Sequence, residues 1–159
     1  MRPAALAVVC VACGSPEAPL SNIAPAAPAH ELLASLQRTE CYGTCPAYTV
    51  TVYRDGAVEY VGDKYVKTTG KAEGHATPAQ LEQLKALFDE QGYLTLHDAY
   101  TDESWTDMPS ATTSYAPPGG VTKQIRHYLG DEHAPKALAE IENGIDRILD
   151  TKRWIGAKD

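Results

Sequence analysis

The chain has 159 residues, of which 43% are apolar and 22% are charged, and its formal net charge at pH 7 is -7. This length and composition predict one globular domain with a normal apolar core rather than two domains or a disordered chain. Because the charge is negative and the sequence has no basic cluster, we expect no nucleic acid partner.

Residues 1–12 are typical of a bacterial lipoprotein signal peptide. Arg2 supplies a positive charge, a short apolar run follows, and the small residue Ala12 precedes Cys13. We therefore expect cleavage before Cys13 and acylation of its thiol and amino group, which anchors the protein to a membrane through lipid. The run itself is too short to span a bilayer. Cys10 stands where such signals usually have leucine, so ordinary secretion and a cytosolic protein stay open as alternatives.

Residues 13–30 are rich in Pro, Ala and Ser and show neither helical nor strand periodicity, which predicts a disordered tether. Residues 31–159 then form a single domain. The expected location is the bacterial cell envelope. Gly14 after the acylated cysteine favours the outer membrane, with the domain facing the periplasm, in a cell that has one.

Two thiols, Cys41 and Cys45, flank Gly43 and precede Pro46. In an exported protein these thiols meet an oxidising compartment, so we predict a structural disulfide that closes a small ring. The chain-entropy treatment gives such a ring about 2 kcal/mol of stabilisation.

A copper site is the alternative interpretation of these cysteines. The Cys-x-x-x-Cys-Pro order also resembles Sco-type copper chaperones, in which two thiolates and a distal histidine bind the metal. Here His127 and His133 follow Cys45 by 82 and 88 residues, and thiolates with imidazole suit copper. The residues after Pro46 argue against a copper site, because they alternate as in a β-strand and do not begin a helix. A thiol oxidoreductase is a further alternative, although the usual redox pair has two intervening residues.

The domain begins with strand patterns. Alternation predicts a strand from Leu32 to Arg38. Residues 48–53 and 57–61 predict a hairpin around a type I′ turn at Asp55-Gly56, and a two-residue turn pairs Tyr53 with Val58 and Thr51 with Tyr60. Further strands are expected at residues 65–69 and 71–75.

Helical periods follow. Thr77-Pro78-Ala79-Gln80 is a capping box with proline at the first helical position, and it predicts a helix over 78–91 that Gly92 ends. Residues 110–116 and 121–129 predict a second hairpin. A second helix presents Leu138, Ile141, Ile145 and Ile148 on one face, and Trp154-Ile155 is expected to pack back onto the core. The predicted class is α+β, an antiparallel sheet of two or more hairpins packed with two helices.

An acidic loop lies between residues 97 and 109, with Asp98, Asp102, Glu103 and Asp107. Carboxylates at this density could hold a hard cation such as calcium. Their spacing does not match an EF-hand loop, and loop aspartates commonly bond to backbone amides, so we predict that the loop binds no cation tightly.

The segments now identified resemble a known family. They are Arg38-Thr39-Glu40-Cys41-Tyr42-Gly43-Thr44-Cys45-Pro46-Ala47-Tyr48, the Asp55-Gly56 hairpin, Tyr100-Thr101-Asp102, Thr106-Asp107-Met108-Pro109 and Lys152-Arg153-Trp154-Ile155-Gly156. Together they are similar to an uncharacterised bacterial domain of unknown function with the signature Cys-x-Gly-x-Cys-Pro-x-Tyr. The likeness covers residues 33–156. It implies an envelope location, often after a lipoprotein or secretion signal, and it carries no catalytic or binding residues.

The sequence therefore predicts a non-enzymatic envelope lipoprotein with a binding or structural domain. Its expected partners are the membrane, through lipid, and an envelope protein or the cell wall. No cofactor, catalytic residue or metal site is expected. The competing function is a periplasmic copper-binding protein that uses Cys41, Cys45 and either His127 or His133.

Overall fold

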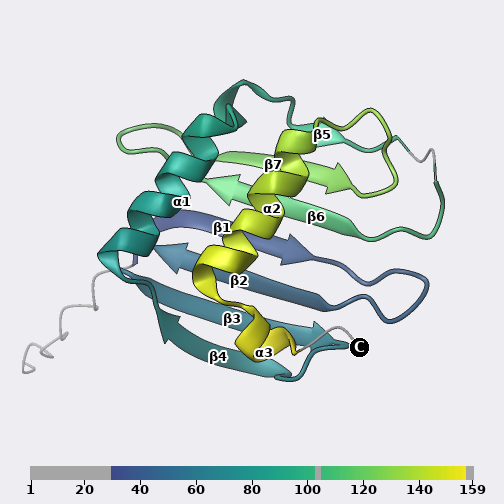
Figure 1. Cartoon of the computed structure of the whole chain (residues 1–159), viewed down its shortest axis with the longest axis horizontal. Coiled ribbons are helices and arrows are strands. Elements are labelled where there is room, and N and C mark those ends of the chain that lie inside the picture. The colour runs from purple at the N-terminus through teal and green to yellow at the C-terminus, as the bar shows by residue number, and fades with distance from the viewer. Residues whose placement is uncertain (1–29, 103–104, 157–159) are drawn as a thin grey trace, which may run out of the picture.

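The computed structural model describes residues 30–102 and 105–156. In this part of the chain, seven strands form one sheet in the order β4-β3-β2-β1-β6-β7-β5. Helices α1 and α2 lie across one face of the sheet (Figure 1). Neighbouring strands are antiparallel except β5 and β7. The predicted α+β class is confirmed, whereas the predicted signal peptide, Cys13 and the tether up to residue 29 lie outside the described residues.

The elements have the following bounds. The strands are β1 (Leu32–Arg38), β2 (Ala47–Tyr53), β3 (Ala57–Lys64), β4 (Gly70–His75), β5 (Ala99–Tyr100), β6 (Ser110–Tyr115) and β7 (Lys123–Tyr128). The helices are α1 (Pro78–Glu90), α2 (Lys136–Leu149) and the short α3 (Lys152–Ile155), and a 3-10 turn (η1) spans Tyr93–Thr95. Among the described residues, no helix has the length and the apolar character needed to cross a membrane.

The β2–β3 hairpin is where we predicted it, but its register differs by one residue. Val50 pairs with Tyr60 and Val52 with Val58. The connecting loop has three residues, 54–56. A type I′ turn needs a positive φ at both of its central residues, here Asp55 and Gly56. Gly56 has a positive φ of 91°, but Asp55 does not, so the predicted turn does not form. A shift of one residue exchanges the two faces of a strand. Tyr60 consequently points into the core with Val50.

Two further strand expectations change. Residues 65–69 form the loop between β3 and β4 rather than a strand, and Tyr65 within it has a left-handed backbone with φ 55°. The second element is β5, which has two residues and lies inside the acidic loop, where we predicted no strand. It adds to the sheet edge by pairing Ala99 with Arg126 and Tyr100 with His127. Sequence periodicity cannot show a strand this short.

Both predicted helices form. At the start of α1, the Thr77 hydroxyl accepts a hydrogen bond from the Gln80 backbone amide. The Gln80 side-chain oxygen accepts one from the Thr77 backbone amide, so the capping box is confirmed. Helix α2 ends at Leu149, the next residue Asp150 has a left-handed backbone, and α3 then returns the chain toward β3. There Trp154 stacks on Tyr60 with the ring centroids 4.9 Å apart, as its predicted return to the core requires.

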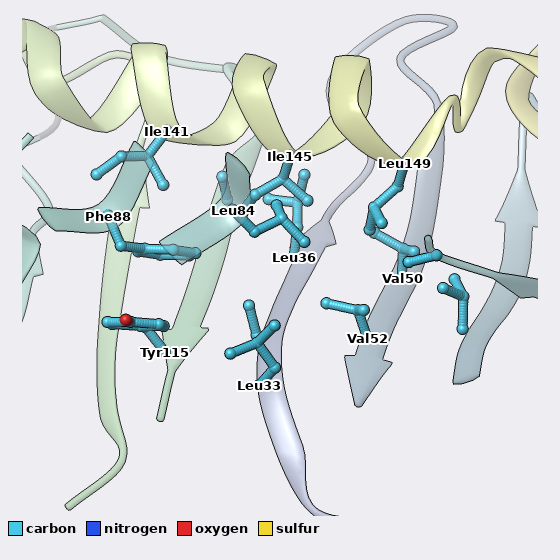
Figure 2. Packing of buried hydrophobic residues seen from close by; sticks show 14 of the residues in the cluster. Leu33, Leu36, Val50, Val52, Leu84, Phe88, Tyr115, Ile141, Ile145 and Leu149 are labelled. Atoms are coloured by element: carbon cyan, nitrogen blue, oxygen red, sulfur yellow. The ribbon is translucent and has the colours of Figure 1, made fainter. Parts of the chain in front are cut away.

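The core lies between the helices and one face of the sheet (Figure 2). Leu84 and Phe88 of α1 meet Ile141, Ile145 and Leu149 of α2 above it. The sheet contributes Leu33, Leu36, Val50, Val52 and Tyr115, among others. Burial of these side chains, at about 1.5 to 3 kcal/mol each, is the main force that holds α2 at its position over the sheet.

Candidate binding cleft

A cleft of about 870 Å³ opens where β1 ends and β2 begins, beneath the C-terminal half of α2. Its walls come from the loop 39–46, the β3–β4 loop, the start of β6, and helices α2 and α3. The lining residues are Arg38, Thr39, Thr44, Cys45, Pro46, Tyr48, Tyr65, Pro109, Ser110, Leu129, Asn143, Asp146, Ile155 and Gly156. Volumes of this size are typical of small-ligand sites.

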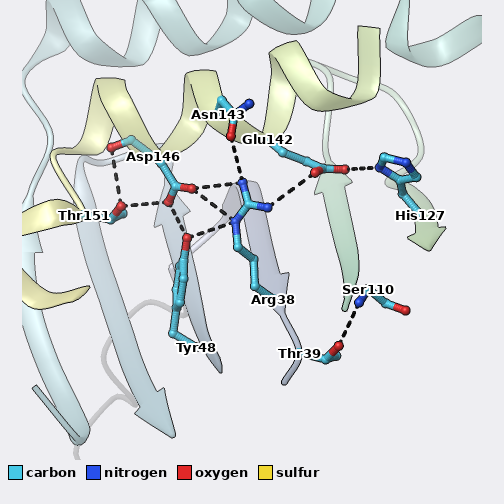
Figure 3. Close-up of polar contacts among 9 residues, drawn as sticks. All are labelled: Arg38, Thr39, Tyr48, Ser110, His127, Glu142, Asn143, Asp146 and Thr151. Atoms are coloured by element: carbon cyan, nitrogen blue, oxygen red, sulfur yellow. Dashed lines mark hydrogen bonds and ion pairs between the residues drawn. The ribbon is translucent and has the colours of Figure 1, made fainter. Parts of the chain in front are cut away.

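Arg38 lies at the floor of this cleft, and it is the last residue of β1 on the helix-covered face (Figure 3). Its Nε and Nη2 donate to the Asp146 carboxylate at 3.2 and 3.1 Å. Nη2 also donates to the Asn143 side-chain oxygen at 3.3 Å. Residues 143 and 146 are one turn apart on α2, so a single guanidinium contacts both of them.

Tyr48 joins the same network from β2, directly opposite Arg38 in the sheet. Its hydroxyl donates to Asp146 Oδ1 at 2.6 Å and accepts from Arg38 Nε at 3.1 Å. Burial, assisted by the negative charge of Asp146, raises the pKa of Tyr48. The hydroxyl therefore stays protonated at neutral pH and acts as a fixed donor. Thr151 completes the shell of Asp146 by donating to Oδ1 at 2.7 Å.

A second carboxylate, Glu142, lies on the other side of Arg38. It is 2% exposed, and His127 Nδ1 lies 2.7 Å from its Oε1. Arg38 Nη1 reaches its Oε2 at 3.5 Å. Burial works to lower the pKa of Arg38, but its interactions with Tyr48, Asp146 and Glu142 outweigh burial and raise that pKa. The guanidinium stays charged and lies between the two carboxylates of Asp146 and Glu142.

Main-chain bonds fix the loops around the cleft. The Thr39 amide donates to the Ser110 carbonyl at 2.9 Å, and the Tyr42 amide donates to the Asp107 carbonyl at 3.2 Å. The Lys67 amide in the β3–β4 loop donates to the Ile155 carbonyl at 3.0 Å. These bonds join the loop 39–46 to the start of β6 and the β3–β4 loop to α3.

The predicted disulfide between Cys41 and Cys45 is present, and Cys45 lines the cleft. It fixes the loop between β1 and β2, which joins Arg38 to Tyr48. Of the two histidines in the copper hypothesis, His127 contacts Glu142, and His133 lies in an exposed turn after Asp131. In residues 30–102 and 105–156, no three His, Cys, Asp or Glu side chains are grouped so that they could hold a metal ion.

The acidic loop has several bonds within the protein. Asp98 pairs with Lys123 at 2.7 Å, and this pairing lowers the pKa of Asp98. The Asp102 amide donates to Asp131 at 3.0 Å, and Trp105 Nε1 donates to Glu132 at 2.6 Å. Glu103 lies outside the described residues. The absence of tight cation binding stays a prediction.

Sequence reasoning did not identify the polar network as a site. Tyr48 is the last residue of the cysteine signature and Arg38 lies three residues before its first cysteine, and these positions were the available signal. Glu142 and Asp146 gave no signal, because a carboxylate on an amphipathic helix is normally solvent-exposed. Only the packing of α2 over the sheet brings these residues within 3.5 Å of Arg38.

Comparison with known proteins leads to a family and not to an activity. No curated protein matches the chain. The sequence profile described as a domain of unknown function, DUF6438, matches residues 33–149, which include β1, β2, the disulfide and α2. The chain therefore belongs to the DUF6438 family.

Proposed function

We propose that this protein is a lipid-anchored protein of the bacterial cell envelope whose domain binds a ligand in the cleft without transforming it chemically. The observation that carries the proposal is the cleft itself: about 870 Å³, bordered by residues of six separate segments, several of which are joined by main-chain bonds. A concave site with a few convergent polar groups is the usual form of a binding site.

The state of the polar groups supports binding over catalysis. Arg38 is paired with Asp146, and Tyr48 donates to the same carboxylate. A general base or a nucleophile needs a group that can change its protonation state near neutral pH. The raised pKa of Tyr48 works against that role, and it suits a group that holds a neighbour in place.

The envelope part of the proposal rests on the sequence before residue 30. Its test is the partition of the full-length protein between soluble and membrane fractions of a bacterial host. We expect the wild-type protein in the membrane fraction after a high-salt wash and the Cys13→Ser variant in the soluble fraction. Cys10→Ser is the matched control, and it should stay with the membrane. A Cys13→Ser protein that is still retained by membranes in high salt contradicts lipid anchoring.

The binding part is tested with the Cys13→Ser chain labelled with ¹⁵N. The probes are monosaccharides, amino acids, dipeptides and small carboxylic acids, screened by amide chemical shifts, and their masses are measured after prolonged incubation with the protein. We expect shifts that cluster on the cleft-lining residues and unchanged masses. Converted probes would make the protein an enzyme, and shifts that cluster elsewhere would remove the cleft as the site.

A further inference from the structure

The cleft shows a second property, which concerns the class of its ligand, and the inference from it rests on the proposed binding function. Of the described residues that line the cleft, only Arg38 and Asp146 are charged, and their side chains are paired at 3.1 Å. The lining therefore has no net charge. A charged ligand would have to replace a partner that Arg38 or Asp146 already has, so the cleft favours an uncharged one.

The paired groups present donors and acceptors side by side. The Asp146 carboxylate already accepts from Arg38, Tyr48 and Thr151, and Arg38 Nη2 donates to Asn143, which leaves the Asn143 amide nitrogen to donate to a ligand. Arg38, Asn143 and Asp146 border the cleft, and the Arg38 and Asp146 side chains are 17% and 22% exposed. A hydroxyl group donates one hydrogen bond and accepts others, so two neighbouring hydroxyls on a sugar ring fit such a mixed array. The Thr44 and Ser110 side chains add further hydroxyls to the wall.

An aromatic ring lies at the cleft as well. Tyr65 lines it and is 53% exposed. The β3–β4 loop that carries Tyr65 is held by main-chain bonds from Lys67 and Thr68 to α3, at 3.0 and 2.9 Å. A sugar ring has one face of C–H groups, and such a face packs on an exposed aromatic ring while the hydroxyls around it reach polar groups. Tyr65 therefore supplies the apolar half of a sugar subsite.

Peptides are recognised mostly through a free strand edge or a long apolar groove. This cleft lies instead at the ends of β1 and β2, both of which are central in the sheet and paired on each side. Its polar groups are side chains of separate elements and not a row of free backbone groups. We propose that the ligand is a neutral oligosaccharide, with one ring on Tyr65 and its hydroxyls on Asn143, Thr44 and Ser110.

The test is calorimetric and NMR titration of the Cys13→Ser chain with three probes: cellotriose, cellotriose oxidised at C6 so that each ring carries a carboxylate, and N-acetylated, amidated trialanine. We expect cellotriose to bind and to shift the amides of Thr44, Tyr65 and Asn143. The oxidised sugar should bind at least about tenfold more weakly, because it brings carboxylates toward Asp146. Trialanine should not bind.

Variants locate the binding. Tyr65→Ala should weaken cellotriose binding at least about fivefold, the ratio that corresponds to 1 kcal/mol at 25 °C, and Asn143→Ala should weaken it too. Tyr42→Ala is the matched control, since Tyr42 is 90% exposed and does not line the cleft; it should leave the affinity unchanged. Equal unfolding midpoints of the three variants in urea would show that lost binding is not lost folding.

Three outcomes overturn the inference. Cellotriose binding that is insensitive to Tyr65→Ala and Asn143→Ala places the sugar elsewhere. Trialanine shifts in the cleft without cellotriose shifts make the ligand a peptide, and the proposed binding function then stands. If none of the three probes binds, the oligosaccharide hypothesis is wrong. The separate probe screen described under the proposed function then decides whether the cleft binds any small ligand.

Discussion

Arg38 connects the core to the cleft, because its stem lies between the sheet and α2 while its guanidinium borders the opening (Figure 3). Replacing it with methionine keeps an unbranched stem but leaves Asp146 and Glu142 without their cation. Removing one partner of a buried ion pair costs about 3 to 5 kcal/mol, and since the Arg38 side chain is 17% exposed, we expect about 2 to 4 kcal/mol. Urea unfolding of Arg38→Met measures this loss.

The control is Arg126→Met on the opposite, uncovered face of the sheet, where Arg126 is exposed. That change should alter the free energy of unfolding by no more than about 0.5 kcal/mol. Equal losses in the two variants would mean that the Arg38 network is screened by solvent and does not hold α2 to the sheet.

Two fully buried tyrosines offer a matched comparison at the same scale. Tyr93 donates its hydroxyl to the Thr113 carbonyl at 2.8 Å, whereas the Tyr60 hydroxyl is buried without a hydrogen-bond partner among the described residues. We predict that Tyr93→Phe lowers the free energy of unfolding by about 1 to 2 kcal/mol and that Tyr60→Phe leaves it unchanged or raises it. The Tyr60 ring stack on Trp154 is kept in Tyr60→Phe. A loss in Tyr60→Phe as large as that in Tyr93→Phe would contradict this account.

At the scale of elements, the β3–β4 hairpin sets the position of Tyr65. A Cβ on Gly62 would overlap the backbone carbonyl of Thr68, which the loop brings across the strand. A backbone atom cannot move aside as a side-chain tip can, so we predict that Gly62→Ala lowers the free energy of unfolding by more than about 2 kcal/mol. Gly70 has φ 77° but open space around its Cβ position, and Gly70→Ala should cost about 1 to 2 kcal/mol of backbone strain. Thermal unfolding of both variants provides the test, and a milder effect at Gly62 than at Gly70 would refute it.

The loop between β1 and β2 is the second element that shapes the cleft, and the disulfide holds it. Ring closure over five residues gives about 2 kcal/mol in the chain-entropy treatment. Replacing Cys41 and Cys45 together by serine should therefore lower the free energy of unfolding by about 1 to 3 kcal/mol. Urea unfolding with and without reductant checks this, because reductant should weaken the wild type and leave the double variant unchanged. A reduced protein that binds one copper ion through both sulfurs and His127 or His133 would instead support the copper function.

For the molecule as a whole, the buried tyrosines predict how stability depends on alkaline pH. Burial raises the pKa of Tyr60 and of Tyr93 to about 12, and it raises that of Tyr48 as well. In the unfolded chain tyrosine has a pKa of about 10. Between these values the folded protein holds more protons than the unfolded chain, so the free energy of unfolding falls as pH rises. The stabilisation that these three tyrosines give to the folded state is fully present below pH 10. It is lost as the pH rises through their pKa values in the folded protein.

We therefore expect alkaline unfolding to begin above pH 10, with Tyr48, Tyr60 and Tyr93 ionising together with the loss of the fold. Absorbance at 295 nm follows the ionisation, and circular dichroism follows the fold. In Tyr93→Phe the pH dependence of the unfolding free energy above pH 10 should be shallower by one proton. Tyrosine ionisation that reaches completion while the circular dichroism is still that of the folded protein would contradict the prediction.

Local sequence was sufficient for the elements that follow from local chemistry. The capping box at Thr77 and Gln80, the apolar face of α2 and the β2–β3 hairpin needed only periodicity and turn residues. The cysteine spacing and the expected export gave the disulfide in the same way. Even so, turn residues left the register of the hairpin wrong by one position, because the choice between a two-residue and a three-residue loop depends on how both strands pack.

The cleft and its chemistry were decided only by tertiary structure. Arg38 and Asp146 are 108 residues apart in the chain, and Tyr65 reaches the same opening from a loop that the sequence pattern presented as a strand. Sequence does place Arg38 and Tyr48 in one segment that resembles the family, but it cannot show that a carboxylate on a distant helix is buried against them. That burial depends on how α2 packs across the sheet, and the packing is set by the apolar side chains of Figure 2 and not by the polar residues they bring together.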